Sequence, residues 1–147
     1  MTTAMHETDF YAWTQEQAKW LRTEALEKLD LPNLAEEIED MGRSEQRELD
    51  NRLTILLRHL LKLGCLPNSN PARGWRSTIK EQRYRIDRLL LKNPSLRSLA
   101  PEIIKDVYPE ASDLALDDLA QDDLADKAFP AHCPWTVEQI LDLHWLP

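Results

Sequence analysis

The sequence predicts an all-α protein, a helical bundle built on a long helix–loop–helix hairpin with shorter C-terminal helices. Apolar residues recur at a helical period over several long segments, and no segment alternates apolar and polar residues over enough positions to form a strand. Only three glycines occur in 147 residues, which argues against a turn-rich β fold. A chain of this length is expected to form a single domain over residues 1–147, with residues 1–8 frayed.

Two nearly identical pentapeptides, WTQEQ and WTVEQ, each predict the start of a helix. Thr14 and Gln17 in the first have the spacing of a capping box, in which the hydroxyl and the amide side chain satisfy two backbone amides. Thr136 and Gln139 repeat this spacing in the second. We therefore expect helices over residues 14–29 and 136–143.

The hairpin is predicted from the middle of the chain. Its first helix, of roughly 30 residues, is expected to follow Asn33 as the N-terminal cap and to run up to Gly64. Gly64 would then be the residue just past the helix end. A loop, CLPNSNPARG, leads to a second helix between Asn70–Pro71 and Asn93–Pro94. The apolar face of this second helix comprises Trp75, Ile79, Gln82, Ile86, Leu89 and Leu90.

The segment after the hairpin is expected to be more broken. Pro101 and Pro109 limit helices to residues 95–108 and 109–120, because proline lacks an amide donor and suits a first turn. The five-residue spacing of Leu114, Leu119 and Leu124 cannot hold one helix face, which predicts a break near Gln121.

Charge is distributed unevenly. The net charge is −8, yet residues 1–42 carry three basic and ten acidic side chains, residues 43–97 carry thirteen and five, and residues 98–147 carry two and eleven. The N-terminal residues have no secretory pattern, and no segment is apolar enough to span a membrane. We expect a cytoplasmic protein that makes no membrane contact, with Cys65 and Cys133 as free thiols.

Five blocks occur in order along the chain: DFYAWTQEQA, NLAEEIEDMGRSEQREL, LLRHLLKLG, RGWRSTIKEQRYRI and FPAHCPWTVEQILDLHWLP. From about Asp9 to Pro147 the chain therefore resembles the bacterial family called domain of unknown function 29. The resemblance implies a small all-helical cytosolic protein, and it supplies neither an activity nor catalytic residues. The acidic DDLAQDDLADKA stands where the family pattern has a shorter link.

The basic segment is a candidate nucleic-acid interface. Arg73, Arg76, Lys80 and Arg83 recur at spacings of three and four with Trp75 and Tyr84 among them, a pattern typical of phosphate binding. The alternative is an ordinary solvated helix face with pairs such as Glu81–Arg85.

A catalytic cluster of Glu37, His59 and Arg76 is a second candidate. The alternative for His59 is a satisfied core histidine, since it borders the leucine seam of the long helix. No nucleophile elbow, phosphate loop or zinc-protease motif is present. The cysteines and histidines lack metal-ligand spacing, so we predict no metal and no cofactor.

Trp145 is the candidate contact for a protein partner, whereas Trp135 has the place of a helix-staple residue. By elimination, the predicted function is a protein-interaction or regulatory module whose partner is another protein. Nucleic-acid binding through residues 43–97 and an enzyme built on the Glu/His/Arg cluster remain the alternatives. The sequence leaves the partner and homo-oligomer formation open.

Overall fold

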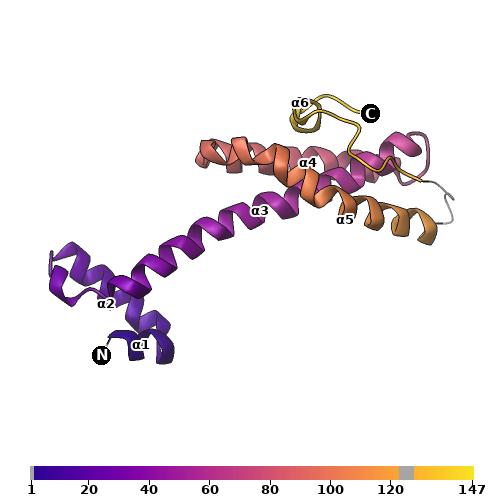
Figure 1. The fold of residues 1–147 in the computed structure, drawn as a ribbon. Coiled ribbons are helices and arrows are strands. Elements are labelled where there is room, and N and C mark those ends of the chain that lie inside the picture. Colours follow the sequence, from indigo (N-terminus) through magenta and orange to yellow (C-terminus); the bar gives the residue numbers. More distant parts are fainter. Residues whose placement is uncertain (1, 123–127) are drawn as a thin grey trace. The chain divides into compact units, whose positions relative to one another are not determined.

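The computed structural model describes residues 2–122 and 128–147, and these residues form helices and no strand (Figure 1). The all-α prediction is therefore confirmed for the described chain. The α-helices are α1 (Thr2–Thr8), α2 (Phe10–Arg22), α3 (Leu31–Cys65), α4 (Ala72–Lys92), α5 (Ala100–Gln121) and α6 (Val137–Leu141); two short 3-10 helices are η1 (Leu26–Lys28) and η2 (Pro94–Leu99).

The chain divides into two compact units, residues 1–44 and 45–147, which we call the N-terminal unit and the C-terminal unit. Helix α3 contributes residues to both. Residues 2–8, expected to be frayed, form α1. No helix of the described residues is long and apolar enough to cross a membrane.

The first WTxEQ copy does not begin a helix. Helix α2 starts earlier, because the Asp9 side chain caps it by accepting a 3.0 Å hydrogen bond from the Ala12 amide. Thr14 lies inside the helix, where its hydroxyl donates to the Tyr11 carbonyl at 2.7 Å. The predicted end at residue 29 is also wrong, since α2 stops at Arg22 and Glu24 then turns the chain with a φ of 56°.

The second WTxEQ copy is the capping box that its spacing predicts. The Gln139 amide donates to the Thr136 hydroxyl at 3.1 Å, and the Thr136 amide donates to the Gln139 side chain at 2.9 Å. The helix that follows, α6, ends at Leu141, slightly earlier than expected.

The predicted hairpin of long helices is confirmed in the C-terminal unit, where α3 is followed by α4. Helix α4 buries the face that its spacing indicated, and the α3 leucines from residue 49 onward line the core beside it. The core residues of α3 are Leu49, Leu53, Leu56, Leu57, Leu60, Leu61 and Leu63, each less than 4% exposed.

The two ends predicted for the first hairpin helix are wrong. Helix α3 already begins at Leu31, and Asn33 is no cap, because its amide side chain donates to Asp30 at 2.7 Å. Gly64 lies within α3 and does not have a positive φ. A Cβ atom at Gly64 would approach Pro147 Cβ to 3.2 Å, so this glycine allows the C-terminal residues to lie close to α3.

Helix α5 runs through Pro109 without a break, so the predicted pair of helices is wrong. An internal proline costs about 3 kcal/mol in an isolated helix. Burial of the side chains on both sides of the proline, including Ile104, Tyr108, Ala111 and Ala115, offsets this cost. The predicted break near Gln121 is confirmed, whereas Leu124 lies outside the described residues.

An ion cluster joins α3 to α5. Asp118 accepts two 2.6 Å hydrogen bonds from the Arg58 guanidinium and one of 2.8 Å from the Lys62 ammonium. These partners lower the pKa of Asp118 to about 2, with the Arg58 hydrogen bond as the largest cause. Lys62 is 5% exposed and also lies 5.3 Å from the centre of the Trp75 ring.

Candidate functional site

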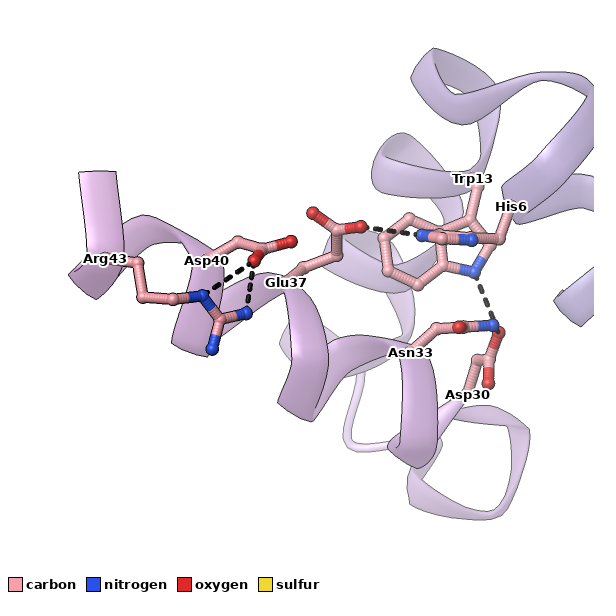
Figure 2. Close-up of polar contacts among 7 residues, drawn as sticks. All are labelled: His6, Trp13, Asp30, Asn33, Glu37, Asp40 and Arg43. Carbon is pink, nitrogen blue, oxygen red and sulfur yellow. Dashed lines mark hydrogen bonds and ion pairs between the residues drawn. The ribbon is translucent and has the colours of Figure 1, made fainter. Parts of the chain in front are cut away.

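The N-terminal unit contains a network of polar side chains that joins α1, α2 and the start of α3 (Figure 2). We call it the N-terminal polar cluster and define it as His6, Trp13, Gln17, Asp30, Asn33 and Glu37. His6 on α1 reaches Glu37 on α3, with 2.8 Å between Nε2 and Oε1. The imidazole also meets the Trp13 ring edge-on, with ring centres 4.6 Å apart.

Asp30 is the centre of the buried part of this cluster. Its Oδ2 atom accepts hydrogen bonds from the Trp13 indole at 3.1 Å and from the Asn33 amide side chain at 2.7 Å. The Asp30 backbone amide donates to the Gln17 side chain at 2.9 Å. The hydrogen bond from Asn33 is the largest cause that lowers the pKa of Asp30, so the buried carboxyl stays ionised.

The chemistry of this cluster is better suited to holding helices together than to moving protons. A histidine–carboxylate pair at 2.8 Å can exchange a proton. However, the Asp30 carboxylate already accepts two N–H donors from its own unit. The Gln17 side-chain nitrogen is buried without a hydrogen-bond partner. This unsatisfied donor is the one buried polar atom of the cluster, in the described structure, that destabilises it.

Replacing Asp30 with alanine is expected to destabilise the N-terminal unit by about 2–3 kcal/mol, because a buried indole N–H and an amide side chain lose their acceptor. Amide hydrogen exchange over residues 2–44 measures this change. Asp40→Ala is the matched control, since the Asp40 carboxylate is exposed and pairs with Arg43 within the same helix. Equal exchange rates in the two variants would contradict the role given to Asp30.

Large apolar side chains of α3 stand exposed beside this cluster. Leu31, Ile38 and Met41 are 63%, 65% and 69% exposed. Their spacing of seven and three residues places them on one face of the helix, and we call them the α3 stripe. Other large apolar side chains of this unit, Phe10, Tyr11, Leu21 and Leu26, are also about half exposed or more.

The predicted catalytic residues have separate partners. Glu37 pairs with His6, the His59 Nδ1 atom lies 2.8 Å from the Ile55 carbonyl oxygen, and Arg76 donates to the Pro67 carbonyl at 2.7 Å. No hydrogen bond or ion pair of the described chain joins any two of Glu37, His59 and Arg76. Burial is the largest cause that lowers the pKa of His59 and favours its neutral form.

Three of the four predicted nucleic-acid-binding residues, Arg73, Arg76 and Lys80, are exposed on α4. Arg83 departs from this expected stripe. It is 2% exposed, and its guanidinium donates to the backbone carbonyls of Ile140, Trp145 and Gln139 at 2.9, 2.6 and 3.2 Å. Residues 76 and 83 lie on nearly the same face of α4, so the helical repeat does not distinguish them. Arg83 is buried because the C-terminal residues cover it, which the spacing alone did not reveal.

Trp145, the predicted partner contact, packs partly buried against Trp135, with ring centres 5.8 Å apart. The described residues contain no group of three or more histidine, cysteine or acidic residues arranged to hold a metal ion. Sequence reasoning missed His6, Trp13 and Asp30. No local motif marks them, because their contacts span 17 and 31 residues of sequence.

Comparisons with known proteins agree with the all-helical fold. The family described as "Domain of unknown function DUF29" matches residues 5–146. A crystal structure of an alpha-helical protein of unknown function from Rhodospirillum rubrum ATCC 11170 is similar, with a TM-score of 0.69 and 27% identity; the match covers 95% of this chain and 90% of that one. A search of the curated proteins found no match.

Proposed function

Since the chain belongs to the family of the domain of unknown function DUF29, whose description names no activity, we propose its function from its surface. It is a bacterial cytoplasmic protein-interaction module, and the α3 stripe is its binding surface. The single observation that carries this proposal is the exposure of Leu31, Ile38 and Met41 on one helix face. The free cysteines, Cys65 and Cys133, suit a reducing compartment.

When a partner covers an exposed apolar stripe of this kind, the burial stabilises the complex. Burying a large aliphatic side chain fully contributes about 1.5–3 kcal/mol. About two thirds of each stripe side chain is available for burial, so we expect each to contribute about 1–2 kcal/mol. The partner that fits is a helix with apolar residues at spacings of three, four and seven.

Charge favours a basic helix as the occupant. Residues 1–42 carry ten acidic and three basic side chains, so a second copy of this unit would meet the first with like charge. A helix with lysine or arginine beside its apolar face meets opposite charge instead. The expected partner is therefore another protein that presents a basic amphipathic helix.

Site-specific crosslinking tests the proposal. The photoreactive residue p-benzoylphenylalanine at position 38 is expected to crosslink a protein partner in native cells, through a basic amphipathic segment that mass spectrometry identifies. The same residue at position 91 is the control, because Leu91 on α4 is also an exposed aliphatic side chain, at 74%. It is expected to give no such product.

A double variant provides the quantitative arm of this test. Ile38→Gln with Met41→Gln is expected to weaken binding of the crosslinked segment, as a synthetic peptide, at least tenfold with unchanged helix content. Crosslinks only to a second copy of the chain, or to a segment that is neither basic nor amphipathic, would overturn the proposed occupant. If the Leu91→Gln variant and the double variant bound the peptide equally well, the α3 stripe would not be the binding surface.

A further inference from the structure

A groove lies between α4 and the C-terminal residues of the C-terminal unit. Its volume is about 280 Å³. Arg76, Lys80 and Tyr84 line it from α4, and Leu143, His144 and Leu146 line it from the other side. Arg83 also borders the groove, but its guanidinium is already bound to three backbone carbonyls.

The groove is cationic although the whole chain is acidic. None of the described side chains that line it is acidic. Lys80 is exposed and makes no hydrogen bond or ion pair among the described residues, and Arg76 uses one nitrogen on the Pro67 carbonyl. More distant carboxylates are screened over roughly 8 Å at physiological ionic strength.

The acidic residues directly adjacent in sequence to the lining residues already have partners. Glu81 pairs with Arg85 at 2.9 Å. Asp142 Oδ1 accepts the backbone amides of His144 and Trp145 at 2.8 and 3.2 Å. The positive charge of Arg76 and Lys80 is therefore available to a ligand.

The spacing on α4 places an aromatic ring next to these charges. Arg76, Lys80 and Tyr84 follow one another at intervals of four residues, which is about 6 Å of helix rise for each step. The Tyr84 side chain is 49% exposed, so one part of its ring is open for stacking. Arg73, three residues before Arg76, extends the row of cations beyond the groove.

We infer that this groove binds nucleotide units, with Arg76 and Lys80 at the phosphates and Tyr84 stacked on a base. Cations in a row beside an aromatic platform are what a single-stranded nucleic acid requires from a protein surface. The apolar ends of Leu143 and Leu146 complete a wall that a sugar or base can contact. A free mononucleotide presents the same chemistry, so the source of the nucleotide is decided by experiment.

Fluorescence anisotropy with a labelled oligouridylate tests the inference, with unlabelled uridine monophosphate and polyglutamate as competitors. Arg76→Glu with Lys80→Glu is expected to weaken binding at least tenfold and to reduce its salt dependence. Tyr84→Ala is expected to weaken binding about 5- to 100-fold, and Tyr84→Phe to restore it. These side chains are exposed, and urea unfolding checks that the variants remain folded.

The matched control is Arg85→Glu with Arg88→Glu, which makes the same change of charge on the same helix. Arg85 and Arg88 line a different groove and not this one. An oligouridylate that binds more tightly than uridine monophosphate identifies a nucleic acid as the source, and equal affinity identifies a free nucleotide. Absence of saturable binding, equal competition by polyglutamate, or an equal loss in the control variant would overturn the inference.

Discussion

Replacing Arg83 with methionine is expected to release the C-terminal residues and to lower the free energy of unfolding by about 3–5 kcal/mol, because three charge-assisted hydrogen bonds are lost. Two of its acceptors, the carbonyls of Gln139 and Ile140, belong to the last turn of α6. Carbonyls of a last turn generally lack a partner within their own helix, although the Gln139 carbonyl also accepts the Asp142 amide at 3.3 Å. Arg83 thus caps α6 from α4, and methionine keeps its apolar stem while removing the donors.

Urea unfolding followed by circular dichroism measures this loss, and hydrogen exchange over residues 136–147 locates it. Arg85→Met is the control, because Arg85 is exposed and pairs with Glu81 on its own helix, an interaction that contributes about 0.3–0.5 kcal/mol. A loss below about 1 kcal/mol for Arg83→Met, the usual contribution of one neutral hydrogen bond, would show that the C-terminal residues are held by packing alone.

Replacing Asp118 with alanine is expected to destabilise the C-terminal unit by about 3–5 kcal/mol, because the nearly buried Lys62 ammonium loses its counter-charge. Thermal or urea unfolding measures the change. Asp113→Ala on the same helix is the control, since Asp113 is exposed. Lys62→Met, made together with Asp118→Ala, is expected to recover part of the loss, because the nearly buried ammonium is then removed.

The same ion cluster makes stability depend on pH. The folded-state pKa of Asp118 is about 2, below its ordinary value of 3.8. Its contribution is therefore fully present above the ordinary value and disappears as the pH falls through the folded value. This difference corresponds to about 2 kcal/mol. The Asp118→Ala variant should lack this part of the acid sensitivity, and an unchanged pH profile would contradict the assignment.

The two WTxEQ copies explain how far sequence patterns could predict the fold. Both contain the capping-box residues, but only the second is a helix start. Pro134 lies just before the second copy and discourages a helix upstream. Before the first copy, Asp9 supplies an earlier cap, so the helix has already begun at Phe10.

Periodicity predicted the helices well and their limits less well. The buried face of α4 follows directly from its repeat, because Trp75, Ile79 and Ile86 face one core. The local rule for Pro109 failed because tertiary packing outweighs the cost of one missing hydrogen bond. The polar cluster and the cap provided by Arg83 could not be predicted, since each depends on contacts between residues far apart in sequence.

Helix α3 also determines the order in which the protein can fold during synthesis. In the described N-terminal unit, Trp13 is the one large apolar side chain that is buried. A core with one large buried side chain contributes little free energy to folding. Helix α3 also contributes to this unit. It continues into the C-terminal unit, where its core residues share one cluster with those of α5, a helix that ends at Gln121. Ribosomes add about 5–20 residues per second, so α5 is complete on the order of 4–15 seconds after residues 1–44 have been synthesised. During this interval an acidic and partly apolar segment is exposed to chaperones and proteases, so slower translation of the later helices lengthens its exposure.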